Sequence, residues 1–524
     1  MINKYKWLFM ASLTLTACSY DDGIENPTEE TVVVTPGSAD FSKYIALGNS
    51  LTSGYSDNAL FKAGQENAFP NLLAQQFALP NGGGGEFKTP YMNDNVGGLL
   101  LGGNLVAGPR LIFNGTAPVA LPGGVPTTEI TNHLTGPFNN MGVPGAKSYH
   151  LLANGYGNVA GVATGQANPY FARFASSGTT SVVADAMAQN PTFFSLWIGN
   201  NDVLGYATGG GVGADQTGNT NVASYGSADI TDPQAFHGIY NQLLTTLTSN
   251  GAKGVVANIP YVYTIPYFTT VPTHPLTTSA LGGGNVAVGE ATVDQLNQQL
   301  IGPIRQVLQA VGQEDRIQFL SKTTANPVLI VDETLTDLSA VLTQALTPAL
   351  GAQTAAFVGQ TYGRARHAKM SSNPLARDYM VLTSSSMIGT TVTGIPEPFN
   401  KLGVTFPMQD QWVLTIDETN QVKVATDAYN TSIKMLAEEK GLAHVDANAI
   451  MVQLANGGLR YDNYHMTAAF VQGGAFSLDG VHLTARANAY VANMFLDAIE
   501  AAYGAKFPKK KLSGYPMHYP RVMP

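Results

Sequence analysis

The chain has 524 residues, of which 44% are hydrophobic and only 12% are charged. That length is sufficient for one elaborated domain or two ordinary ones with a large buried core. The formal net charge of −9 argues against a nucleic-acid partner, which would require a basic face, and the single cysteine excludes an intrachain disulfide.

The N-terminus has the organisation of a bacterial export signal. Two lysines precede a largely apolar run over residues 7–15, which is too short to span a bilayer as a permanent helix. The tetrapeptide Leu-Thr-Ala-Cys that ends at Cys18 resembles the lipobox of bacterial lipoproteins, in which the cysteine is acylated and becomes the mature N-terminus. The alternative is an ordinary secretory signal with a free thiol. We expect a signal peptide over residues 1–17 and a lipid on Cys18 that holds the protein at a membrane surface.

The segment that follows, residues 18–40, is polar and acidic and has little apolar surface to bury, so it predicts a flexible tether. Serine directly after the cysteine and acidic residues soon after it resemble lipoproteins sent to the outer membrane. We therefore expect a monomeric outer-membrane lipoprotein, on the periplasmic side or at the cell surface.

The first element of the predicted core is a buried strand over residues 44–47, which Gly48 ends. Ser50 then lies on the first turn after a strand. In open α/β sheets ligands bind at that edge, so Ser50 is a candidate nucleophile, although most such serines only cap a helix.

A strand-helix alternation continues along the chain. An amphipathic helix over residues 69–77 precedes a glycine-rich region at about 81–136, which we interpret as loops over the active-site face. A second buried strand over residues 192–198 runs directly into Gly199-Asn200-Asn201-Asp202. A helix opening at Pro233 and a strand over residues 255–259 follow. This order predicts a parallel sheet with right-handed crossovers.

A large insertion interrupts the alternation at about residues 261–421. It contains a helix over residues 293–311 that Gly302-Pro303 should kink, and it predicts a subdomain or cap, with a proline-rich set of loops as the alternative. The core pattern then resumes and closes with a C-terminal helix from Thr484. We expect one domain over residues 41–503 and a basic, solvated tail over residues 504–524.

Hydrolysis through serine requires a base, a group that orients the base, and donors for the developing oxyanion. Two histidines have an aspartate three residues upstream, His465 with Asp462 and His482 with Asp479. Only the second pair lies in a glycine-containing turn that leads into a helix, so it is preferred. The Asn201 carboxamide and the N–H of Gly145 are candidate oxyanion donors, although residues in such turns are usually only structural.

Four segments together resemble the sequence blocks of the SGNH, or GDSL, hydrolase family. In chain order they are Gly48-Asn49-Ser50-Leu51, then Gly145, then Gly199-Asn200-Asn201-Asp202, then Asp479-Gly480-Val481-His482. The resemblance implies a flavodoxin-like three-layer α/β/α fold. It also implies a nucleophile at Ser50, a general base and later acid at His482, and an orienting carboxylate at Asp479. The implied oxyanion hole is the Ser50 N–H, the Gly145 N–H and the Asn201 side chain.

The resemblance covers roughly residues 41–260 and 422–503 and leaves the insertion unexplained. Asn49 stands where the family usually has aspartate, which affects the local turn more than the chemistry. Gly142, three residues from Gly145, makes the glycine donor the least secure assignment. The implied activity is ester hydrolysis, with a lipid or an acylated glycan as substrate. No histidine pair lies at ligand spacing with a supporting carboxylate and cysteine, so we expect no metal, and we expect no cofactor.

Two alternatives differ from this interpretation. An α/β-hydrolase elbow would read Gly-x-Ser-x-Gly, but Thr52 stands where its second glycine would be, and the acid here lies unusually close to the histidine. A surface lipoprotein that has lost catalysis and binds glycan or lipid is the second alternative, and the intact set of site residues speaks against it. The glycine-rich, apolar segment at 81–130 favours acyl chains or lipids as substrates.

Overall fold

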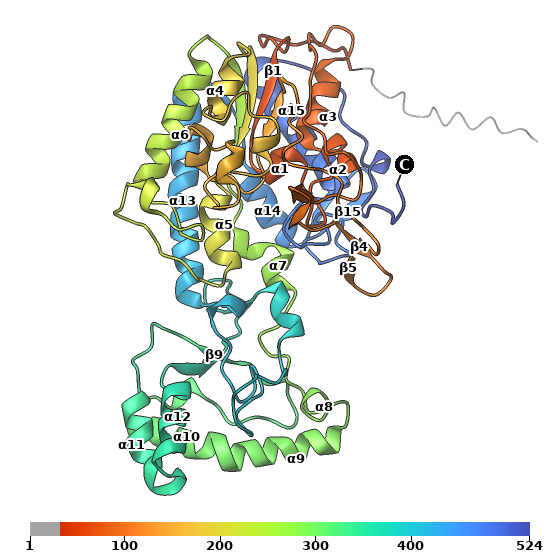
Figure 1. Cartoon of the computed structure of the whole chain (residues 1–524). Coiled ribbons are helices and arrows are strands. Elements are labelled where there is room, and N and C mark those ends of the chain that lie inside the picture. Colours follow the sequence, from red (N-terminus) through yellow and green to blue (C-terminus); the bar gives the residue numbers. More distant parts are fainter. Residues whose placement is uncertain (1–31, 524) are drawn as a thin grey trace, which may run out of the picture.

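A five-stranded parallel β-sheet forms the centre of the larger of two lobes in the computed structural model, which describes residues 32–523 (Figure 1). The predicted signal peptide and Cys18 lie outside the described residues. Every neighbouring pair of strands in the sheet is parallel, so the architecture is α/β. In spatial order the strands are β13 (Ala443–Val445), β8 (Lys253–Ala257), β7 (Phe193–Trp197), β1 (Tyr44–Gly48) and β6 (Asn140–Gly142).

The strand order reverses between β1 and β7. Counted in chain order within the sheet, the strands lie 2-1-3-4-5, which is the order of flavodoxin-like sheets. At such a reversal the connections leave in opposite directions, and a crevice opens at the carboxyl ends of the strands. Ser50 follows β1 and Asn201 follows β7, so the fold brings these two residues to neighbouring strands at one edge.

Helices cover both faces of this sheet. In Figure 1, α4, α6 and α13 lie on one side of the strands, and α3 and α15 lie on the other. Helix α6 begins as its sequence predicts, with the Asp232 side chain accepting the Ala235 N–H ahead of the first-turn proline. The bounds of these five helices are α3 (Phe69–Phe77), α4 (Val182–Met187), α6 (Pro233–Thr248), α13 (Ile416–Glu439) and α15 (Ala485–Tyr503).

Short elements complete this lobe around the carboxyl edge of the sheet. The glycine-rich region, expected to be loops, contains two antiparallel hairpins, because its scattered apolar residues pair across tight glycine turns. The hairpins are β2 (Leu99–Leu101) with β3 (Asn104–Ala107), and β4 (Leu111–Phe113) with β5 (Pro118–Ala120). The others are α1 (Ser50–Ser53), α2 (Lys62–Glu66), α5 (Asn201–Thr208), α7 (Pro266–Thr269), α14 (Ala447–Ala455), β14 (Leu459–Tyr461) and β15 (Tyr464–Met466).

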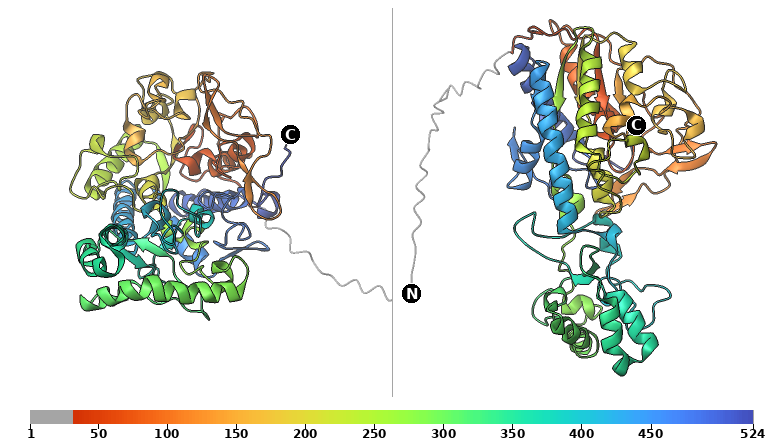
Figure 2. Two further views of the ribbon diagram at one scale, coloured as in Figure 1. Left: turned by 60° about the horizontal axis from the view of Figure 1, so that its bottom comes forward. Right: turned by 90° about the vertical axis from the view of Figure 1, so that its left-hand side faces the viewer.

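The smaller lobe is formed by the middle of the chain and has hydrophobic clusters of its own (Figures 1 and 2). The insertion begins inside the larger lobe, because Ile265 belongs to the main core and the Tyr267 N–H binds the carbonyl of Gly480, 3.0 Å away. The elements are α8 (Thr278–Leu281), α9 (Val286–Leu296), α10 (Gly302–Ala310), β9 (Leu329–Val331), α11 (Ser339–Leu350), α12 (Ala352–Tyr362), β10 (Ala365–His367), β11 (Tyr379–Met380) and β12 (Val413–Leu414).

The long helix of this lobe differs from the sequence prediction in its start and in its irregularity. It begins at Val286, and a π-helical turn over Asn297–Ile301 precedes Gly302-Pro303. Proline has no N–H to donate to the preceding turn, and the wider π turn is where the helix accommodates that loss.

Both ends of the described chain pack against the larger lobe. Thr35 and Lys506 exchange backbone hydrogen bonds, and Ala39 is buried, so the packed chain begins before residue 41. The C-terminal segment is not a solvated tail, because Phe507 and Tyr519 are buried in it. Among residues 32–523 no helix is both long enough and apolar enough to span a bilayer.

A buried ion-pair network fixes the junction between the lobes. The Arg366 guanidinium binds both oxygens of Asp378, at 2.6 and 2.8 Å, and it also binds Asp332. Asp378 is fully buried and further accepts the N–H groups of Lys369 in the smaller lobe and Ile416 at the start of α13. Every charge in this network is therefore partnered.

We predict that Asp378→Ala destabilises the protein by about 3–5 kcal/mol, because two backbone N–H groups lose their acceptor and the buried Arg366 guanidinium keeps only Asp332 as a carboxylate partner. The control Asp294→Ala removes the exposed ion pair with Lys322, whose side chains are 40% (Lys322) and 66% (Asp294) exposed, and should cost less than about 1 kcal/mol. Denaturant unfolding of both variants measures the difference, and equal losses would contradict the importance of the buried network.

Candidate active site

Ser50 is positioned by a tight turn between β1 and α1. A side chain at Gly48 would come within 2.1 Å of Thr52 Oγ1 and 2.5 Å of the Trp197 carbonyl oxygen, so only glycine fits there. Ser50 is the first residue of α1, where backbone N–H groups have no partner within the helix. Its side chain is mostly covered, since the residue is 8% exposed. The turn thus presents both the Ser50 hydroxyl and an N–H at the carboxyl edge of the sheet.

Asn49 has two structural roles in this turn. Its Oδ1 accepts the Leu51 N–H and caps α1, while its Nδ2 donates to Asn200 Oδ1 at 3.2 Å. An ionised aspartate could make the first of these hydrogen bonds but could not donate the second. The asparagine therefore ties the Ser50 turn to the turn that carries Asn201.

The structure brings Ser50, His482 and Asp479 into one hydrogen-bonded chain. His482 Nε2 lies 2.9 Å from Ser50 Oγ, and His482 Nδ1 lies 2.8 Å from Asp479 Oδ2. The other Asp479 oxygen accepts the N–H groups of His482 and Val481, and Oδ2 also accepts the Asn58 N–H. The short Asp-Gly-Val-His spacing lets one carboxylate both fold the turn and orient the imidazole.

The ionisation of Asp479 fixes the direction of these hydrogen bonds. Burial opposes ionisation of its carboxyl, but the charge that His482 can carry and the hydrogen bonds from His482 and Val481 together hold the pKa of Asp479 well below its usual range. An ionised carboxylate only accepts hydrogen bonds, so His482 Nδ1 carries a proton. His482 Nε2 can then accept the Ser50 proton.

The segment after β6 is fastened beside Asn201. Asn201 Nδ2 donates to the Ala146 carbonyl at 2.8 Å, which orients the amide and leaves its second hydrogen available. Asp202 is buried and binds both the N–H and the hydroxyl of Ser148, at 2.8 and 2.7 Å. Gly145, directly before Ala146, is exposed and has φ of +81°, a conformation that favours glycine.

Gly142 has a different role from Gly145. A side chain at Gly142 would come within 2.3 Å of the Ser53 N–H nitrogen, so this glycine lets β6 pack against the backbone of α1. Of the two glycines, Gly145 is the one that adjoins the segment bound to Asn201.

The second Asp-His pair is not joined in the structure. His465 Nε2 lies 2.8 Å from the carbonyl oxygen of Gly457, and Asp462 accepts the Leu512 N–H. His465 and Asp462 therefore stabilise loops. Of the two Asp-His pairs, it is Asp479 with His482 that contacts a serine.

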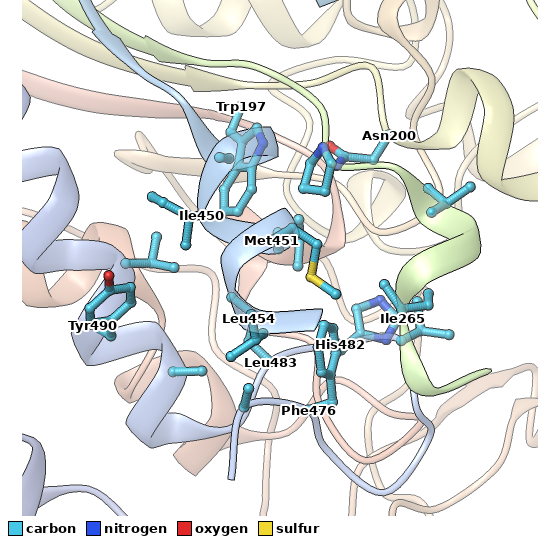
Figure 3. Close-up of a pocket in the computed structure, with 18 of the residues that line it drawn as sticks. Trp197, Asn200, Ile265, Ile450, Met451, Leu454, Phe476, His482, Leu483 and Tyr490 are labelled. Atoms are coloured by element: carbon cyan, nitrogen blue, oxygen red, sulfur yellow. The ribbon is translucent and has the colours of Figure 1, made fainter. Parts of the chain in front are cut away.

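An apolar cavity opens beside the serine (Figure 3). Its empty volume is about 990 Å³, part of which is open to solvent. The walls come from the ends of β7 and β13, from α14 and α15, and from the β14–β15 hairpin, elements that are distant in sequence. Polar residues of the site, Ser50, Asn200, Asn201 and His482, are among those that line it.

Asp57 is a residue of the site that the sequence did not reveal. It is 2% exposed, its Oδ1 accepts the Leu478 N–H, and its Oδ2 has no hydrogen-bond partner among the described residues. Ser477 Oγ accepts the Asp57 N–H and donates to Asp479, so the two carboxyl groups are close neighbours. Burial, reinforced by the charge of Asp479, raises the pKa of Asp57 to about 7.

No family model matches the chain, and no curated protein matches it. Among solved structures, the crystal structure of LAE5, an alpha/beta hydrolase enzyme from the metagenome of Lake Arreo, Spain, is similar over 88% of this chain and 97% of that chain. The two chains share 10% sequence identity, with a TM-score of 0.31. Likeness at this level carries no functional conclusion.

Among residues 32–523 there is no group of three or more histidine, cysteine or acidic side chains arranged to hold a metal ion.

We predict that Asp57→Asn becomes progressively more stabilising as the pH rises. The folded protein holds the Asp57 proton up to about pH 7, whereas an unfolded aspartate releases it near 3.9, so wild-type stability falls as the pH rises between these values. Asparagine has no proton to lose and keeps the acceptor for Leu478. Melting temperatures of both proteins between about pH 5 and pH 8 test this, and a difference that does not change with pH would contradict it.

Proposed function

We propose that the protein is a serine ester hydrolase of the SGNH, or GDSL, type that acts through an acyl-enzyme intermediate. The observation that carries this proposal is the hydrogen-bonded chain from Ser50 through His482 to Asp479, with distances of 2.9 and 2.8 Å. A base within hydrogen-bond reach of a nucleophile, itself oriented by a carboxylate, is the arrangement that activates serine.

The surroundings of Ser50 support the SGNH type in particular. The nucleophile follows the first strand of a sheet ordered 2-1-3-4-5, and the acid lies three residues before the histidine on one turn. An α/β-hydrolase would instead place its nucleophile on a Gly-x-Ser-x-Gly elbow.

The reaction follows from these positions in two steps. Ser50 Oγ bonds to the ester carbonyl carbon as its proton moves to His482 Nε2, and the C–O bond to the alcohol then breaks as the alcohol oxygen takes that proton. A water molecule next gives a proton to His482 and bonds to the acyl carbon, and Ser50 Oγ leaves with the proton. Asp479 stays ionised and stabilises the imidazolium in both steps.

The oxyanion of each tetrahedral intermediate requires hydrogen-bond donors already in place. The Ser50 N–H at the start of α1 and the free hydrogen of Asn201 Nδ2 supply two. The Gly145 N–H is the third donor in this proposal, on the segment that Asn201 and Asp202 hold beside the site.

We predict that Ser50→Ala abolishes both covalent labelling by a fluorophosphonate and hydrolysis of p-nitrophenyl butyrate. The matched control Ser249→Ala changes an exposed serine at the end of α6 and should leave labelling and turnover intact. Continued labelling of Ser50→Ala would show that another residue is the nucleophile. A wild-type protein that does not label but binds glycan would instead support a lapsed hydrolase.

We predict that Asn201→Ala lowers kcat for ester hydrolysis by about 10²- to 10³-fold, because one oxyanion donor is lost. KM should change little, since the donor acts mainly on charge that develops in the transition state. Steady-state kinetics on a thermally intact variant measure both constants, and a loss below about tenfold would remove Asn201 from the oxyanion hole.

A further inference from the structure

Most of the side chains that line the cavity beside Ser50 are apolar. Trp197 and Phe476 form two of its walls, and α14 contributes Ile450, Met451 and Leu454 (Figure 3). Polar lining side chains are confined to the site residues around Ser50 and to Tyr490 on α15. The other lining side chains are apolar, and the Trp197 indole N–H already donates to the Asn258 carbonyl. Placing a hydroxyl against such walls would cost free energy.

Several apolar side chains that line the cavity are only half-buried. Ile450 on α14, Leu483 after the catalytic turn, and Val491 and Met494 on α15 all have intermediate exposure. All four line the cavity, so they contribute apolar surface to it. An aliphatic ligand would bury this surface, which is the favourable interaction that such a pocket offers.

Apart from Tyr490, the polar side chains of the cavity are those of the site already described. Ser50 and His482 line it together with Asn201, the side chain that is to bind the oxyanion. A carbonyl carbon held at Ser50 Oγ can therefore extend its alkyl substituent directly into the apolar space. Asn200 and Asn49, which also line the cavity, already bond to each other.

We propose that this cavity binds the acyl chain of the ester, so that the substrates are esters of medium-chain or longer aliphatic acids and not acetyl esters. This inference rests on the proposed serine hydrolase function. It assigns specificity to the acid half of the substrate, whether that acyl chain is attached to a lipid or to a glycan.

An acyl pocket should make kcat/KM depend on acyl chain length in a series of esters that share the same leaving group. Each methylene that enters the cavity should raise kcat/KM by about threefold to fourfold. For p-nitrophenyl esters, the increase from acetate to octanoate should reach about three orders of magnitude if all of the added methylenes enter the cavity.

We predict that Ile450→Trp lowers the ratio of kcat/KM for p-nitrophenyl octanoate to that for p-nitrophenyl acetate by about tenfold or more, because indole fills part of the cavity. The matched control is Val452→Trp, two residues along α14, where the side chain is 38% exposed and does not line the cavity. That variant should keep the wild-type ratio. Leu454→Trp, one turn further along α14, provides a second filling variant if Ile450→Trp does not fold.

The outcomes separate this inference from the function on which it rests. Wild-type protein that cleaves acetate and octanoate esters equally well, or an Ile450→Trp ratio equal to that of Val452→Trp, overturns the acyl pocket and leaves the hydrolase intact. Binding of a fluorescent dodecanoic acid analogue, measured on wild type and Ile450→Trp, tests the pocket without turnover. A third outcome is that wild-type protein binds the analogue but neither labels nor turns over, while Ile450→Trp does not bind it. That outcome would support the pocket and overturn the hydrolase.

Discussion

The hydrogen bond between Ser50 Oγ and His482 Nε2 joins residues that are 432 positions apart in the chain. It exists because hydrogen bonds hold the loop after α1 against the loop before α15 at the carboxyl edge of the sheet. Four further hydrogen bonds connect these loops: Asn58 N–H to Asp479 Oδ2, Asp57 N–H to Ser477 Oγ, Leu478 N–H to Asp57 Oδ1, and Ser56 Oγ to the Leu483 carbonyl. The same contacts that close the fold therefore also orient the imidazole.

The topology of the sheet explains why the remaining parts of the site meet at the same point. A strand reversal between β1 and β7 leaves a crevice there, and residues on both strands enter it. Asn201 opens α5 directly after β7, while the segment after β6 reaches the crevice from the other side of β1 and is held by Asn201 and Asp202. The proposed donors and nucleophile thus follow three neighbouring strands of one sheet, which would limit their movement as charge develops.

Much of this arrangement could be predicted from the sequence because its signals are local. Buried strands such as residues 44–48 and 193–197 are continuous apolar runs, and the Asp479-Gly480-Val481-His482 turn carries acid and base on four consecutive residues. The π turn ahead of Pro303 is less visible, because Gly302-Pro303 indicates an irregularity in the helix but not the form that it takes.

Other features could not be predicted because they exist only between distant segments. The apolar cavity is formed by side chains from β7, α14, the β14–β15 hairpin and α15, each of which has the ordinary pattern of a core element by itself. The second hydrogen bond of Asn49 is to Asn200, which is 151 residues away in the sequence, so the local sequence around Asn49 does not indicate it. Packing of the C-terminal segment depends likewise on Arg110, whose guanidinium binds the carbonyl of Pro520, 2.6 Å away.

Asp57 and Asp479 show how one small region can treat two buried carboxyl groups in opposite ways. Asp479 accepts hydrogen bonds from the His482 ring, the His482 N–H and the Val481 N–H, and together with the charge that His482 can carry these outweigh the cost of burial and keep it ionised. Asp57 has one N–H donor and an oxygen without a partner among the described residues, so burial dominates and its pKa rises. Because a protonated Asp57 places no negative charge beside Asp479, Asp479 is the one anion of this pair below about pH 7. The environment that raises one pKa thereby protects the charge on which the histidine depends.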